Sequence, residues 1–198
     1  MAKANNAPAS LPKASAQIEW QYYPRSKKAP TLAESVVHAF AGEAGRIASE
    51  SFDLASNEVL EALREPLQVI GFEVESGKHK DEKVCVPVLF GRGGAIEKSF
   101  DADAYHRAGG FVLEVEAGRG VVNHQFLKDL FQACMMYEVN YLAIAIRRVY
   151  KGARDFETVC RFFDHCTQAT ALNFRWKAYL LLGIDPEVPG LVFLAVSL

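Results

Sequence analysis

Hydrophobic residues in the first third of the chain recur at intervals that predict two helices. Residues 31–34 carry a capping-box pattern that is typical of a helix start, and an apolar stripe follows them at helical spacing. A second helix is expected from Ser56 or Asn57 to about Val69, because apolar side chains again return every three or four residues and Gly71 ends the pattern.

The rest of the chain is dominated by short apolar or alternating runs. These runs predict strands at residues 72–75, 84–90, 98–105, 111–116, 141–146 and 178–184, an edge strand at 191–196, and helices at about 121–136 and 155–170. The run 141–146 is almost wholly apolar, as in a strand that is buried on both faces. The early strands can pair as antiparallel hairpins, whereas the strands before and after helix 121–136 can form a parallel crossover. We therefore predict an α/β fold with a mixed central sheet flanked by helices.

Length and composition limit the class of protein. A chain of 198 residues that is 50% hydrophobic fits one globular domain, which we place at residues 31–198. Residues 1–30 are rich in Ala, Ser, Pro, Asn and Lys, and we expect a flexible or loosely attached N-terminal segment. The chain shows no signal-peptide pattern and no apolar run long enough to cross a bilayer, so we expect a cytoplasmic protein without a membrane partner.

Two acidic pairs on neighbouring predicted strands are the main candidate for chemistry. Asp101 and Asp103 lie two residues apart, as do Glu114 and Glu116. Alternate side chains of a strand share one face, so pairing of the two strands would bring these carboxylates together. Like charges at such distances repel, and a hard divalent cation is the usual partner that stabilises them. The pattern therefore predicts a metal site that can bind a phosphate.

The order of elements and the acidic pairs together resemble the PD-(D/E)xK nuclease superfamily, over roughly residues 56–147. The resemblance implies a restriction-endonuclease-like fold, whose core is a helix, three strands, a helix and a strand. It implies that Asp103 and Glu114 hold Mg²⁺ or Mn²⁺, with the backbone carbonyl of Val115 as a further ligand.

One position departs from the family pattern, because Glu116 occupies the place of the usual lysine. Some type II restriction enzymes carry an acidic residue there and remain active. With Asp103 and Glu114, Glu116 is therefore a candidate catalytic residue, either as general base or as a metal ligand. Lys98 or Lys128 would supply the missing positive charge.

Further side chains complete the expected site. Asp101 or Glu43 would join Glu116 if a second ion binds; Glu43 lies on the apolar stripe of the first helix, unless that helix ends early at its glycines and leaves Glu43 in solvent. Positively charged residues beyond the strand ends are candidates for phosphate contacts, because such contacts supply most nonspecific affinity for DNA. These candidates are Arg119, Lys128, Arg147 and Arg148.

Three functions remain open at this stage. The first is a Mg²⁺-dependent nuclease acting on DNA, either as a single chain or as the homodimer that many relatives form. The second is a noncatalytic nucleic-acid-binding or assembly module derived from the same fold, which would keep a basic groove and lose the metal. The third is a metallohydrolase of small phosphates, which would have a closed pocket. The net charge of −2 gives no overall basic field to favour a nucleic-acid partner.

Overall fold

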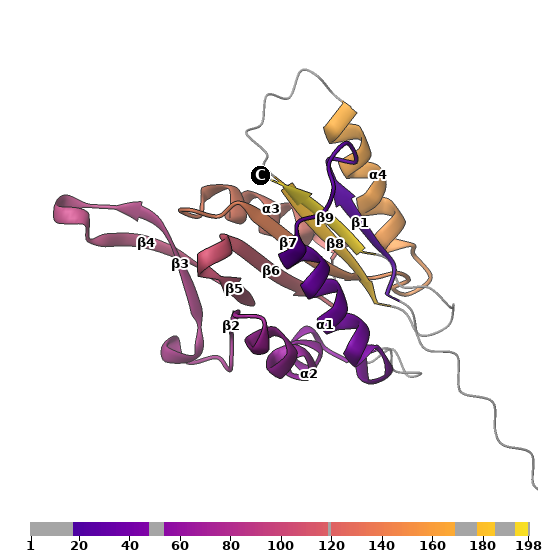
Figure 1. The fold of residues 1–198 in the computed structure, drawn as a ribbon, viewed down its shortest axis with the longest axis horizontal. Coiled ribbons are helices and arrows are strands. Elements are labelled where there is room, and N and C mark those ends of the chain that lie inside the picture. The colour runs from indigo at the N-terminus through magenta and orange to yellow at the C-terminus, as the bar shows by residue number, and fades with distance from the viewer. Residues whose placement is uncertain (1–17, 48–53, 119, 169–177, 185–192, 198) are drawn as a thin grey trace, which may run out of the picture.

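The computed structural model describes residues 18–47, 54–118, 120–168, 178–184 and 193–197 (Figure 1). The helices are α1 (Thr31–Ile47), α2 (Ser56–Val69), α3 (Gln125–Met135) and α4 (Asp155–Gln168). The strands are β1 (Trp20–Tyr23), β2 (Glu73–Val74), β3 (Val84–Phe90), β4 (Ile96–Ala102), β5 (Ala104–His106), β6 (Phe111–Glu116), β7 (Tyr141–Arg147), β8 (Ala178–Ile184) and β9 (Phe193–Ser197). Within these ranges, no helix combines the length and the apolar character that crossing a membrane requires.

The central sheet is mixed, as the sequence predicts. Strand β5 lies between β2 and β6 and runs antiparallel to both, whereas β6, β7 and β8 run parallel to one another. Helices α1 and α2 cover one face of the sheet, and α3 and α4 cover the other (Figure 1). The parallel step from β6 to β7 through α3 confirms the predicted crossover.

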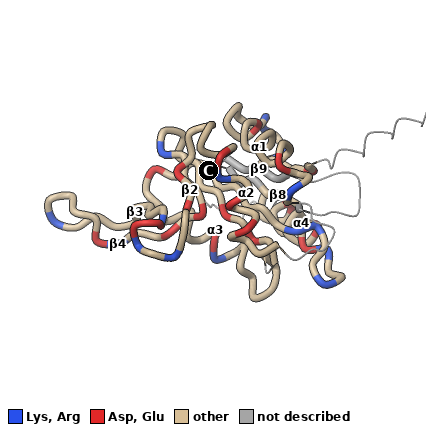
Figure 2. Tube along the Cα trace, turned by 90° about the horizontal axis from the view of Figure 1, so that it is seen from below, with Lys and Arg blue, Asp and Glu red and all other residues tan. Residues whose placement is uncertain are grey.

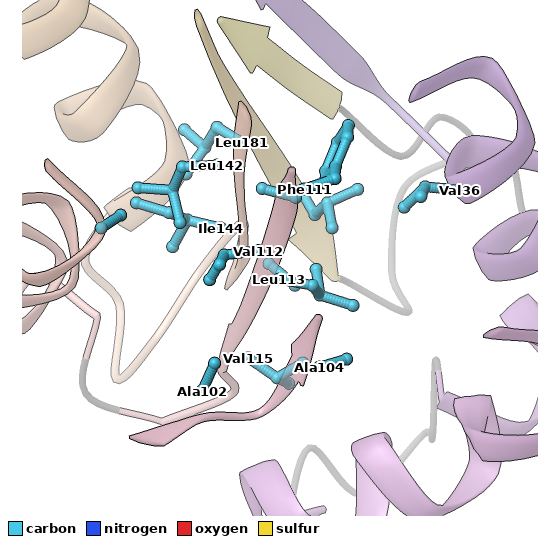
Figure 3. Close-up of a cluster of buried hydrophobic side chains, with 14 of the residues drawn as sticks. Val36, Ala102, Ala104, Phe111, Val112, Leu113, Val115, Leu142, Ile144 and Leu181 are labelled. Carbon is cyan, nitrogen blue, oxygen red and sulfur yellow. The ribbon is translucent and has the colours of Figure 1, made fainter. Parts of the chain in front are cut away.

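Side chains of the central strands divide between two core layers. Leu142 and Ile144 of β7 point to the side of α3 and α4, whereas Leu113 of β6 points to the opposite side, where Val36 of α1 lies (Figure 3). All four side chains are fully buried. Because alternate residues of a strand face opposite sides, Glu114 and Glu116 of β6 must face α3.

The acidic segment predicted as one strand at 98–105 is two strands that join at Asp103. Strand β4 pairs with β3 in a separate two-stranded sheet, a hairpin that projects from the body (Figure 1). Strand β5 pairs instead with β6, with Ala104 opposite Leu113. The expectation that Asp101 and Asp103 share one strand face is therefore wrong, because the chain changes partner strands between them.

The N-terminal expectation is wrong for the residues around β1. Strand β1 pairs antiparallel with β8, and the side chains of Tyr22 and Tyr23 are buried. The Tyr23 hydroxyl donates to Asp164 Oδ1 at 2.9 Å, which attaches this strand to α4. The segment is thus part of the sheet although its sequence looks like a tail. Residues 1–17 lie outside the described residues.

We predict that Leu63→Ala lowers the free energy of unfolding by about 2–5 kcal/mol, because Leu63 of α2 is 0% exposed and its removal leaves a cavity. Val69→Ala, on the same helix but at a position 80% exposed, should change it by less than about 0.5 kcal/mol. Urea denaturation followed by circular dichroism measures both. Equal losses in the two variants would contradict the described packing of α2.

Candidate active site

Acidic side chains from several elements line one pocket of about 300 Å³, here called the acidic pocket. It lies where the end of β4, the second half of β6, helix α3 and the start of α2 meet, and several acidic positions lie close together in this region (Figure 2). Its charged lining residues are Glu75, Lys83, Asp101, Asp103, Glu114, Glu116, Lys128 and Asp129. Its other polar lining residues are Ser56, Asn57, Gln125 and Gln132.

Asp103 is fixed against β6 by a backbone hydrogen bond. The pairing of β5 with β6 ends at Ala104 and Leu113, and beyond that point the Val115 N–H donates to Asp103 Oδ2 at 2.7 Å. The Asp103 carboxylate thus accepts the hydrogen bond that the backbone carbonyl of a longer β5 would otherwise accept. Because N–H and C=O of one strand residue point to the same side, the Val115 carbonyl lies on the Asp103 side of β6. Burial raises the Asp103 pKa to about 6, although the Val115 N–H and Lys83 act against this rise.

Glu114 and Glu116 reach the acidic pocket from the face of β6 that α3 covers. Burial raises the pKa of Glu114 well above its usual range, and the nearby carboxyl groups of Asp103 and Asp129 raise it further. Burial also raises the pKa of Glu116, while hydrogen bonds from Asp129 and Gln125 and the charge of Lys128 lower it. Both carboxyl groups therefore favour their protonated forms more than a solvated glutamate does.

Asp129 of α3 is a site residue that the sequence reasoning missed. Its side chain is 4% exposed, and its Oδ2 atom accepts no hydrogen bond within the described part of the chain. Burial and the charge of Glu116 raise its pKa to about 8, and the two side chains share a hydrogen bond. A hydrogen bond between two carboxyl groups requires a proton, so the pair of Asp129 and Glu116 holds one between them. The available signal was its position on the buried stripe of the helix, three residues after Phe126 and four before Ala133.

A lysine that the sequence analysis did not single out also reaches the acidic pocket. Lys83, just before β3, forms an ion pair with Glu75 at 2.5 Å, and the two side chains are 25% and 12% exposed. The charge of Lys83 lowers the pKa of Asp103, which places this ammonium group near the Asp103 carboxylate. The sequence pattern gives no sign of this ion pair, because the path of the loop between residues 75 and 83 brings the two side chains together.

Two expected accessory residues line the acidic pocket and two do not. Asp101 and Lys128 are among its lining residues. Glu43 lies elsewhere, in a cavity between α1 and α2, where it pairs with Arg46 at 2.7 Å. Lys98 lies on the projecting hairpin, where its ammonium group is 5.5 Å from the centre of the Phe100 ring. The expectations for Glu43 and Lys98 are therefore wrong. Neither the position of Glu43 on an apolar helix stripe nor the position of Lys98 in an acidic strand determines which cavity the side chain enters.

The arginines expected to contact phosphate have different positions. Arg147, at the end of β7, donates to the Leu54 carbonyl at 2.7 Å and lines a second cavity beside the acidic pocket. Arg148 points elsewhere: its Nε lies 3.5 Å from Glu19, and its side chain is 18% exposed. Arg119 lies outside the described residues.

The oxygen atoms that line the pocket are suitable ligands for a divalent cation, although they are not yet arranged around one point. Within the described residues, no three acidic, histidine or cysteine side chains are already arranged as a ligand set. The donors present are carboxylate oxygens and one backbone carbonyl, which are the hard ligands that Mg²⁺ and Mn²⁺ prefer. The buried Oδ2 atom of Asp129 has no hydrogen-bond partner among the described residues, so the pocket also contains an unsatisfied oxygen. The residues therefore fit a cation that binds as their protons leave.

Comparisons of the chain with protein-family models, with curated proteins and with solved structures found no match. The geometry of the acidic pocket is therefore the basis for a function.

We predict that, in EDTA, the thermal midpoint falls as the pH rises from about 4 to 8. The folded-state pKa values of Asp103 and Asp129, about 6 and about 8, exceed the usual value of 3.8, so the folded protein binds more protons than the unfolded chain in this range. Asp129→Asn should flatten the profile, because it removes one of these groups. Differential scanning fluorimetry across pH measures this. A midpoint that rises between pH 6 and 8 would contradict the assigned burial.

Proposed function

We propose that this protein is a metal-dependent nuclease that hydrolyses phosphodiester bonds of DNA. The observation that carries the proposal is the acidic pocket, in which Asp103, Glu114, Glu116 and Asp129 converge from three parts of the chain. Burying so many carboxyl groups together is unfavourable unless cations or protons neutralise them. A structural role alone gives no reason for this arrangement in a pocket that is open to ligands.

The arrangement of elements supports a restriction-endonuclease-like fold. The sheet order places β2, β5, β6 and β7 side by side, and the chain visits them in the sequence α2, β2, β5, β6, α3, β7. This sequence agrees with the helix, three strands, helix and strand that the resemblance implies. The hairpin of β3 and β4 is then an insertion between the first and second core strands, and Asp103 lies at the start of the second.

The carboxyl groups divide into metal ligands, a general base and a positioning residue in the proposed reaction. Asp103, Glu114 and the Val115 carbonyl would hold Mg²⁺ or Mn²⁺, and the bound ion would polarise the phosphate and lower the pKa of the attacking water. Glu116 accepts the proton of that water as general base. Asp129 shares a hydrogen bond with Glu116 and so holds this base in orientation.

Lys83 replaces the lysine that the family places in the position of Glu116. Its ammonium group lines the same pocket and is held there by Glu75. A fixed positive charge at this point stabilises the negative charge that develops on the phosphate. Lys128 supplies a second positive charge on the α3 side, next to Glu116 and Asp129.

We predict that Asp103→Asn and Glu114→Gln each reduce Mg²⁺-dependent or Mn²⁺-dependent cleavage of DNA by more than about 100-fold, since even residues that only orient metal ligands contribute about 10- to 100-fold. Glu43→Gln should cleave like the wild type, because Glu43 lies in a different cavity. Gel assays on circular and linear DNA measure the rates, and circular dichroism checks folding.

Cleavage that persists in Glu114→Gln would contradict the proposal. A wild-type protein that binds DNA but does not cleave it with either metal would favour the noncatalytic module, and hydrolysis restricted to a small phosphomonoester would favour the small-phosphate enzyme.

We predict that Lys83→Gln lowers the cleavage rate by about 100-fold or more, the usual effect of removing one group that stabilises transition-state charge. Because this change leaves Glu75 unpaired, the double variant Lys83→Gln with Glu75→Gln separates folding from catalysis: it should regain any lost stability and remain slow. Lys98→Gln is the matched control and should keep wild-type rates. Wild-type rates in Lys83→Gln would remove this lysine from the mechanism.

A further inference from the structure

A second cavity, of about 540 Å³, opens at the carboxyl ends of β6 and β7 and is here called the basic cavity. Its lining residues are Leu54, Ala55, Ala117, Gly118, Arg147, Val149, Tyr150, Lys151 and Gly152. Two of them carry positive charge and none carries negative charge. Its volume falls within the range of cavities that hold small organic molecules.

The basic cavity and the acidic pocket share a wall. Ala55 and Ala117 line the basic cavity, and their chain neighbours Ser56 and Glu116 line the acidic pocket. A hydrogen bond from the Ala117 N–H to Ser56 Oγ, of 3.0 Å, crosses this wall and holds the start of α2 against the end of β6. The two cavities are therefore neighbours, separated by the contact between the start of α2 and the end of β6.

The cations of the basic cavity are grouped around one aromatic ring. The guanidinium carbon of Arg147 lies 5.9 Å, and the ammonium nitrogen of Lys151 lies 5.3 Å, from the centre of the Tyr150 ring. The Leu54 carbonyl fixes the Arg147 guanidinium at 2.7 Å. Both cations therefore line the cavity beside the same ring, and guanidinium and ammonium groups are the usual protein contacts of phosphates.

A tight turn holds Tyr150 and Lys151 in place. The backbone N–H groups of Tyr150 and Ala153 each donate to the carbonyl of the other at 2.9 Å. Lys151 and Gly152, between them, have φ values of 48° and 82°. Paired hydrogen bonds around two residues with positive φ are typical of a rigid two-residue turn. The cavity wall is therefore organised before any ligand binds, which reduces the entropy lost on binding.

We propose that the basic cavity holds the nucleotide adjacent to the phosphodiester bond in the acidic pocket. Arg147 and Lys151 contact its phosphate, and the apolar wall formed by Leu54, Val149 and Ala117 contacts its sugar and base. This inference rests on the proposed nuclease function, since it assigns the acidic pocket to the neighbouring phosphate. It explains how a chain of net charge −2 binds a polyanion: a local pair of cations beside the acids replaces an overall basic field.

The test measures binding without hydrolysis. Fluorescence anisotropy follows a labelled single-stranded oligonucleotide binding to the full chain in EDTA, over a series of salt concentrations. Lys151→Glu is preferred to an Arg147 variant, because Lys151 is exposed whereas Arg147 also ties β7 to residue 54. Lys27→Glu, an exposed residue in the turn between β1 and α1, is the control with the same change of charge.

Lys151→Glu should raise the Kd by about tenfold or more and reduce the slope of log K against log salt by about one, as expected when a phosphate contact is lost. Lys27→Glu should change the Kd by less than about twofold, because an exposed charge far from the ligand is screened by salt. A mononucleotide should displace the oligonucleotide at concentrations where inorganic phosphate does not.

Several results would overturn the inference: no binding by the wild type at low salt, equal weakening by both lysine variants, or equal competition by inorganic phosphate and the mononucleotide. Cleavage assays on the same samples keep the two proposals separate. DNA cleavage together with normal binding by Lys151→Glu overturns the nucleotide site alone. Weakened binding by Lys151→Glu in a protein that never cleaves DNA overturns the nuclease alone.

Discussion

The contact between the two acidic segments is completed by one hydrogen bond, the 2.7 Å bond from the Val115 N–H to the Asp103 carboxylate. It forms because β5 stops pairing with β6 at Ala104, so the edge of β6 beyond Leu113 needs a new acceptor. The alternation of side chains along β6 directs Glu114 and Glu116 toward α3. Asp103 and Asp129 line the same pocket. The composition of the acidic pocket follows from this local change of hydrogen-bond partner.

The energetic constraint on the site is the burial of like charges. Without a cation, protons must neutralise part of the cluster, which agrees with the raised pKa values of Asp103, Glu114, Glu116 and Asp129. Lys83 and Lys128 offset some of the remaining repulsion. A site of this kind gains most from a divalent cation at neutral pH, because the cation replaces the protons and supplies more charge. In the proposal, the positive charges of the adjoining basic cavity then contact the phosphate of the adjacent nucleotide.

The sequence predicted what depends on local periodicity and missed what depends on contacts between distant segments. The bounds of β3, β6 and β8 were predicted to the residue, because each is an apolar or alternating run between clear breaks. The antiparallel pairing that brings Asp103 to β6 is one that the sequence allowed but did not require. Strand β1 was missed because its burial depends on β8 and α4, which lie more than 130 residues away. Lys83 and Asp129 were missed because only the assembled fold directs their side chains into one pocket, and Glu43 was placed there wrongly for the same reason.

The central claim is that Asp103 and Glu114 form one cation site whose protons leave when the cation binds. Calorimetric titration of the full chain with Mn²⁺ near pH 6.5, in two buffers with different ionisation enthalpies, tests this claim most directly. The account predicts binding with net proton release in the wild type and in Glu43→Gln, and loss of that binding in Glu114→Gln. Absence of binding at millimolar Mn²⁺, or equal binding by Glu114→Gln, would contradict it.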